Sequence, residues 1–94
     1  MKKYIINFEK VNTYYDFYNE IIKGLNLPNW CGQNPDAIWD LLTGHFGVPA
    51  EITITGIENI PVNLLAEWQL CKKAIEDAEG WFKKHNETIK FIYK

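Results

Sequence analysis

Short apolar runs with β-branched or aromatic side chains occur at three places in the chain. Residues 3–8 are rich in isoleucine and aromatics, residues 51–55 (Glu-Ile-Thr-Ile-Thr) alternate polar and apolar side chains, and residues 88–93 form a similar run. Such runs, and alternation with a period of two, are typical of strands. We therefore predict three strands, the second of which ends at Gly56.

Between these runs the apolar positions follow the period of a helix. Phe17, Ile21 and Leu25 recur every fourth residue, and either Asn12 or Thr13 can cap this helix. Thr13 with Asp16 three positions later forms an imperfect capping box. A long helical pattern extends over about residues 62–84, and Pro61 opens either this helix or a short turn before it. Both segments are predicted to be amphipathic helices. The predicted apolar side of the long helix contains Leu65, Trp68, Ala74, Ile75, Ala78 and Phe82.

A further helix is predicted within residues 29–47. Asn34 is a good N-cap, Pro35 suits the first helical position, and Gly44 is placed for a left-handed C-terminal cap. At about 100° per residue, this helix has one aliphatic side and one side that faces solvent. The aliphatic side holds Ile38, Leu41 and Leu42, and the solvent side holds Asp36, Trp39, Asp40 and Thr43.

The order strand, helix, helix, strand, helix, strand sets the expected architecture. Helical connections between strands favour parallel pairing. We therefore predict an α/β fold, a small three-stranded parallel sheet with helices packed against it. The length of 94 residues suits one domain spanning residues 1–94, and a hydrophobic share of 47% supplies its core.

Asp36 and Asp40 are the main candidates for function. They lie one turn apart on the predicted exposed side, where two like charges repel by a few tenths of a kcal/mol. Stability alone therefore does not select the pair. Asp36 also has a structural explanation, because a carboxylate in the first turn favours the helix dipole. Asp40, in mid-helix beside Trp39, lacks that explanation.

The net charge is −2, but the charges are unevenly placed. From Gly24 through Cys71 there are acidic residues and no lysine or arginine, and all ten basic residues are lysines nearer the two ends. Either this is an ordinary solvated surface, or the stretch presents a negative field to a basic partner. A negative field argues against nucleic acid as a direct partner.

The sequence gives no sign of a membrane segment or of a cysteine framework. No apolar run approaches the roughly 20 residues of a membrane span, and the run near the start is too short for a signal peptide. We therefore expect a cytoplasmic protein with no membrane association. Cys31 and Cys71 form no metal-ligand cluster. Free thiols are expected in a reducing compartment, and a single bridge between the two is left open.

The segment 27–44 resembles the barstar family of intracellular ribonuclease inhibitors, and weaker similarity covers most of the chain. The resemblance implies the same three-stranded α/β fold. It also implies a monomer that forms a 1:1 complex with a basic, extracellular-type ribonuclease of the barnase kind, without cofactor or metal. The residues that carry it are Leu27-Pro28, Gly32, Asn34, Asp36-Ala37, Trp39-Asp40 and Leu42-Thr43-Gly44, in the family's order.

In that family the residue matching Asp40 is the central anchor, placed among the basic groups that normally hold the substrate phosphate. A carboxylate is a compact anion that arginine binds in two places. The resemblance therefore implies that this helix and its preceding loop block the active-site cleft. The implied partner-binding residues are Trp30, Asn34, Asp36, Trp39, Asp40, Thr43, Gly44, His45 and Asp77.

The chain departs from the family pattern near this segment. Trp30 and Cys31 replace two tyrosines common in the family, His45 stands where an aromatic often lies, and Gly47 where an acid is expected. The alternatives to partner contact are structural: a Trp30 ring folded back onto the core, a structural or merely exposed His45, and an Asp77 on a solvated helix face. Gly32 is interpreted as a turn with positive φ, and Trp68 and Trp81 as packing residues.

Two other functions stay open. The departures from the family pattern leave room for an interaction or immunity module that neutralises a different basic protein or toxin. A metal-dependent enzyme would combine the two aspartates with a histidine. However, the histidines His45 and His85 are far apart in the sequence, and the chain has no phosphate-binding loop or nucleophile elbow. We therefore expect no catalytic activity.

Overall fold

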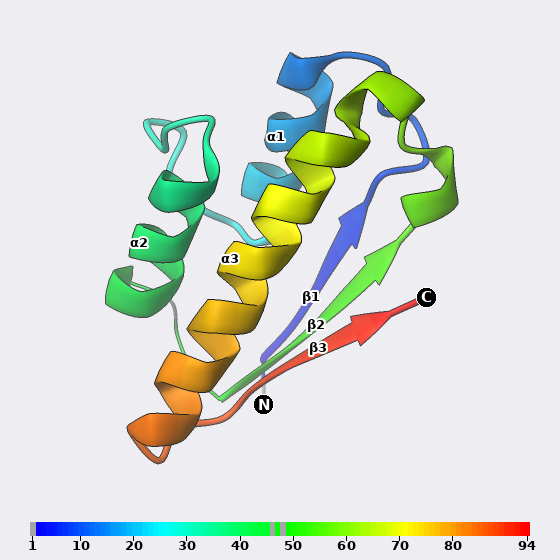
Figure 1. Ribbon diagram of the computed structural model, residues 1–94. Helices are drawn as coiled ribbons and strands as arrows, with labels where there is room; N and C mark the ends of the chain where they lie inside the picture. Colours follow the sequence, from blue (N-terminus) through cyan, green and yellow to red (C-terminus); the bar gives the residue numbers. More distant parts are fainter. Residues whose placement is uncertain (1, 46, 48) are drawn as a thin grey trace.

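The computed structural model describes residues 2–45, 47 and 49–94, which fold around a three-stranded sheet (Figure 1). The strands are β1 (Lys2–Asn7), β2 (Ala50–Thr55) and β3 (Ile89–Tyr93), in that order across the sheet. Both pairings are parallel, with Lys2 opposite Ala50 and Ala50 opposite Ile89. The predicted α/β fold with a small parallel sheet is confirmed.

The sheet buries one of its two faces. Along β2, Ile52 and Ile54 are fully buried, whereas Thr53 and Thr55, which point to the opposite face, are half-buried. The three labelled helices lie on the buried side (Figure 1). The β2 strand ends before Gly56, whose φ of 73° is left-handed. A Cβ at Gly56 would also lie 2.6 Å from the Glu9 backbone nitrogen, so this turn requires glycine.

Helix α1 (Tyr14–Gly24) begins at the predicted cap. The Asp16 N–H donates to Thr13 Oγ1 at 3.1 Å, and the Thr13 N–H donates to Asp16 Oδ2 at 3.2 Å, which completes the capping box. The predicted apolar side is also confirmed, because Phe17 and Ile21 are fully buried. This side of α1 packs on the sheet beside β1.

Helix α3 (Leu65–Lys84) begins later than the sequence pattern predicts. The 3₁₀ helices η1 (Ile57–Asn59) and η2 (Val62–Leu64) precede it, and the Leu64 N–H donates to the Pro61 carbonyl at 2.8 Å. The tighter 3₁₀ turn changes the side-chain directions, so Leu64 is buried while Leu65 is 40% exposed. The prediction that Leu65 is a core residue was therefore wrong. The core stripe consists of Leu64, Trp68, Cys71, Ile75, Ala78 and Phe82.

A polar contact within the core joins α1 to α3. The Tyr18 hydroxyl donates to the Glu67 carboxylate, and the Cys71 thiol donates to the Tyr18 oxygen at 3.3 Å. Burial raises the pKa of Tyr18 above its usual value, and burial likewise raises the pKa of Cys71 to about 11. Cys31 and Cys71 are both free, so they form no bridge with each other.

A membrane span needs a long, apolar helix. Within the part of the chain that the structure describes, no helix meets both requirements.

Candidate functional site

Helix α2 (Pro35–His45) carries the predicted carboxylate pair, and its start is fixed by Asn34. The Ala37 N–H donates to Asn34 Oδ1 at 2.8 Å, and Pro35 occupies the first helical position. The predicted N-cap is confirmed. Because the Asn34 side-chain oxygen satisfies this N–H, the Asp36 carboxylate is not needed for capping.

The orientation of α2 follows from its aliphatic side. Ile38 and Leu42 are fully buried and Leu41 is 5% exposed, and the helix packs against α3 (Figure 1). Asp36 and Asp40 are both exposed. The predicted division of the helix into an aliphatic and an acidic side is therefore confirmed for these residues.

Trp39 and Thr43 lie at the border of the exposed side of α2, and the ring of Trp39 is partly exposed, as its predicted place on this side implies. Trp39 is half-buried and packs against the core, and the Thr43 hydroxyl donates to the Trp39 carbonyl at 2.9 Å. A threonine hydroxyl bonded back to its own helix is already satisfied. Of the four residues predicted for the solvent side, Asp36 and Asp40 are the most exposed.

Two expectations about glycines were wrong. Gly44 does not form a left-handed cap, because α2 continues through it to His45, and among the described glycines only Gly56 has a positive φ. Gly32 does not have a positive φ either, and a Cβ there would lie 3.1 Å from both Ala37 Cβ and Asn34 Nδ2. The loop therefore approaches the start of α2 closely at this glycine. The side chain of His45 lies outside the described residues.

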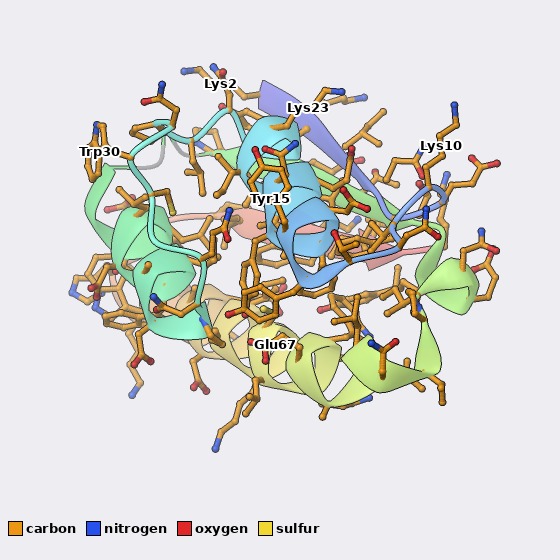
Figure 2. The ribbon with its side chains drawn as sticks, turned by 90° about the horizontal axis from the view of Figure 1, so that it is seen from above. Lys2, Lys10, Tyr15, Lys23, Trp30 and Glu67 are labelled. Atoms are coloured by element: carbon orange, nitrogen blue, oxygen red, sulfur yellow. The ribbon has the colours of Figure 1, made fainter. Side chains whose placement is uncertain are left out.

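The loop before α2 exposes one aromatic ring. Trp30 is 71% exposed and projects away from the fold (Figure 2), so the alternative of a ring folded back onto the core was wrong. Cys31 is buried at 6% exposure, and this burial raises the pKa of its thiol. The Tyr14 hydroxyl donates to the Gln33 carbonyl at 2.6 Å, which ties α1 to the end of the loop.

Asp77 of α3 lies beside α2. Asp36 and Asp77 line one shallow hollow of about 450 Å³ between the two helices. Asp77 also lines a neighbouring hollow of about 400 Å³, together with Trp39 of α2 and Trp81 of α3. The fold therefore brings Asp36, Trp39 and Asp77 to one surface from two helices.

Two lysines of α3 lie at this surface, although residues 24–71 contain no lysine. Lys73 lines the first hollow and Lys84 the second. A Cβ at Gly47 would lie 3.1 Å from Lys2 Nζ, so a lysine of β1 also reaches the chain that follows α2. The absence of lysine over residues 24–71 therefore does not make a purely acidic surface, because α3 and β1 supply cations from elsewhere in the sequence.

Sequence reasoning named Asp77 as a candidate but not the neighbouring residues of α3 that line the same hollow, Trp81 and Lys84. Asp77, Trp81 and Lys84 are spaced at i, i+4 and i+7, which places them on one helix face. Trp81 packs partly against the core, and its ring stacks on His85 with a centroid distance of 4.1 Å. His85 Nδ1 donates a hydrogen bond to the Trp81 carbonyl oxygen at 2.8 Å, because a carbonyl oxygen can only accept. This periodicity was the signal that could have found the face.

The described residues differ in what they could bind. No three His, Cys, Asp or Glu side chains in the part described converge in a way that would hold a metal ion. Exposed carboxylates beside tryptophan rings are instead suited to cationic side chains, which form charge-assisted hydrogen bonds with carboxylates and stack on indoles.

Comparisons with known proteins agree with this fold. Residues 1–94 match the family model described as Barstar (barnase inhibitor). A protein of Bacillus subtilis (strain 168), described as "Putative ribonuclease inhibitor YrdF", is 33% identical over 61 residues. That match covers 62% of this chain and 64% of the relative. Because the family model matches the chain throughout, this protein belongs to the barstar family.

Proposed function

We propose that this protein inhibits a basic ribonuclease of the barnase type by placing α2 and the loop before it in the active-site cleft. The observation that carries the proposal is the exposed pair Asp36 and Asp40 on the outer side of α2, in a chain of the barstar family. The name of the Bacillus subtilis relative supports the same class of function. The proposal implies a 1:1 complex in the cytoplasm.

Each side chain has a proposed task that follows from its chemistry. Asp40 takes the position of the substrate phosphate, because a carboxylate accepts the same bidentate hydrogen bonds from arginine. Asp36 pairs with a neighbouring cation of the enzyme. Trp30, exposed at 71%, supplies a large flat contact area. Inhibition is steric, since the inhibitor fills the site and offers no bond to cleave.

The test compares Asp40→Asn with Glu58→Gln. Both variants remove one exposed negative charge, but Glu58 lies in η1, on the opposite side of the molecule from α2 in Figure 1. A purified basic ribonuclease of the barnase type is titrated with each protein while RNA cleavage is followed. Asp40→Asn should lose about 2 kcal/mol of binding or more, roughly 30-fold in Kd.

Glu58→Gln should inhibit as the unchanged protein does, and thermal unfolding of both variants should stay within about 0.5 kcal/mol of it. Equal inhibition by the Asp40 and Glu58 variants would contradict the assignment of the anchor. No inhibition by the folded, unchanged protein would contradict the proposed function itself.

A second candidate function is the neutralisation of a different basic protein. The observation in its favour is Cys31, which stands where the family commonly has tyrosine and is buried at 6% exposure. The loop therefore offers a partner one aromatic ring, that of Trp30, which would suit a different contact surface. This candidate predicts that the protein does not inhibit RNA cleavage but co-elutes with its basic partner in gel filtration.

A further inference from the structure

A hollow of about 400 Å³ lies between the C-terminal half of α1 and the outer edge of β1. We propose that it binds an extended acidic segment of another protein, with an aliphatic side chain of that segment against Ile5 and its carboxylates on nearby lysines. None of the lining residues belongs to α2, its loop or α3, so the site is separate from the proposed ribonuclease contact. They are Ile5, Asn7, Lys10, Glu20, Lys23 and Gly24.

The hollow lies at an edge of the sheet where main-chain groups face outward. The Phe8 N–H donates to the Thr55 carbonyl at 3.0 Å. Alternate residues of a parallel strand bond to the neighbouring strand, so the main-chain groups of Ile5 and Asn7 point away from β2. A Cβ at Gly24 would lie 2.5 Å from the Ile5 carbonyl oxygen, so α1 covers the edge there. The Asn7 main chain is left facing the hollow, and extended peptides bind such sheet edges.

Ile5 gives the hollow an apolar wall. Its side chain is 64% exposed, whereas that of the next residue, Ile6, is fully buried beneath the helices. Lys3 and Asn7, on the same side of β1 as Ile5, are exposed and polar. An aliphatic side chain packed on Ile5 would therefore bury apolar surface that folding leaves in water, which favours binding.

The charges of the hollow favour an anion. Lys10 and Lys23 line it, and Glu20 is the one acid among its lining residues. Figure 2 shows Lys2, Lys23 and Lys10 along the same edge of the molecule, on the side away from α3. Ammonium groups form charge-assisted hydrogen bonds with carboxylates. The hollow therefore prefers a charge opposite to the one that suits the acidic side of α2.

The mixture of side chains favours an acidic peptide over a nucleic acid. A polynucleotide has no aliphatic side chain to cover Ile5, and Glu20 would repel its phosphates, whereas a peptide can carry carboxylates only where the lysines lie. The Glu9 N–H donates to Asn7 Oδ1 at 2.9 Å. Asn7 Nδ2 therefore remains to donate to a carbonyl or carboxylate of the peptide.

An NMR titration of the isotope-labelled full chain tests the proposal. The probe is the acetylated peptide amide Asp-Ile-Glu-Leu-Asp, and the control peptide Asn-Ile-Gln-Leu-Asn has side chains of the same shape without the charges. We expect saturable amide shifts in residues 5–10 and 20–24 with the acidic peptide. The neutral peptide should bind at least about fivefold more weakly, because it makes no ion pair.

Variants of the protein locate the site. The double variant Lys10→Gln/Lys23→Gln should bind the acidic peptide at least about fivefold more weakly. The matched control Lys83→Gln/Lys84→Gln, which loses the same charge from α3, should bind it as the unchanged protein does. Ile5→Thr keeps the β-branched shape and should weaken binding at least about threefold. All five side chains are exposed, so none of these variants should unfold the protein.

Several outcomes would overturn the proposal. Two are the absence of saturable shifts at the hollow and equal peptide binding by the two lysine double variants. Tighter binding of a short oligothymidylate of the same charge would assign the hollow to nucleic acid. Self-association of the unchanged protein that Asp40→Asn abolishes would make the acidic helix of a second copy the occupant. Weaker ribonuclease inhibition by Lys10→Gln/Lys23→Gln would make the hollow part of the ribonuclease contact.

Discussion

Gly24 and Gly80 both lie in helices, and the structure predicts that replacing them with alanine has opposite effects on stability. At Gly80, inside α3, a Cβ meets nothing within 4 Å. Alanine should therefore gain the full propensity difference of about 1 kcal/mol. At Gly24, the last residue of α1, a Cβ would lie 2.5 Å from the Ile5 carbonyl oxygen and 3.0 Å from Ile6 Cα. These are backbone atoms of a strand, so they cannot rotate away.

The expected magnitudes follow from these distances. Overpacking against a fixed backbone costs about 1–3 kcal/mol, and the propensity gain at a helix end is smaller than in its interior. Gly24→Ala should therefore be destabilised by about 1–2 kcal/mol net, while Gly80→Ala is stabilised by about 1 kcal/mol. For a domain of this size, 1 kcal/mol shifts Tm by about 4–8 °C.

Urea unfolding, followed by tryptophan fluorescence and circular dichroism, would measure both changes from midpoints at constant m. Two outcomes would refute the reasoning. If Gly24→Ala were as stable as Gly80→Ala, α1 would not approach β1 as closely as described. If Gly80→Ala were destabilised, the α3 surface at that point would not be open.

Two further predictions concern tyrosine and cysteine side chains. Tyr14→Phe removes the hydrogen bond to the Gln33 carbonyl and should cost about 0.5–1.5 kcal/mol of unfolding free energy; an unchanged urea midpoint would contradict this. The pKa of Cys71 rises from 9.0 to about 11 on folding, so the stability from its buried neutral thiol is complete below pH 9 and is lost as pH rises toward 11. That loss is on the order of 3 kcal/mol. In the Cys71→Ala variant, the urea midpoint should fall less steeply as the pH rises, and the fall that remains is due to Tyr18. If the variant and the unchanged protein had identical pH profiles, Cys71 would not be the source of this loss of stability.

Periodicity alone predicted the elements that carry the fold. Phe17 and Ile21 are four positions apart because both are buried on the same side of α1. The aliphatic residues of α2 are likewise spaced to lie on its buried side. The spacing of Asp36 and Asp40 made them a candidate site, and the family resemblance added a role for them in partner binding. Periodicity and the family resemblance both describe short segments of the chain. They therefore predicted which side of a helix is buried better than they predicted where the helix begins and ends.

The errors arose where tertiary contacts decide the local structure. Because η2 is a 3₁₀ turn, Leu64 is buried and Leu65 is exposed. The apolar pattern does not distinguish a 3₁₀ turn from the first turn of an α-helix. Gly32 lies close to Ala37, a contact across the loop that the sequence pattern does not reveal. The neighbourhood of Trp39 and Trp81 depends on how α2 packs on α3, and helix spacing within each segment carries no information about that packing.

The parallel sheet has a consequence for how the protein folds. Lys2 pairs with Ala50, 48 positions later, and Ala50 pairs with Ile89, 39 positions later, so each strand pairing closes a long loop of chain. Closing such loops costs entropy before any strand contact forms, and topologies dominated by distant pairings fold slowly. Both α1 and α2 lie inside the loop that the β1–β2 pairing closes. The acidic side of α2 therefore lies within a segment whose ends meet only when β1 and β2 pair. If α2 carries the proposed inhibition, a newly made chain becomes active only after this distant pairing has formed.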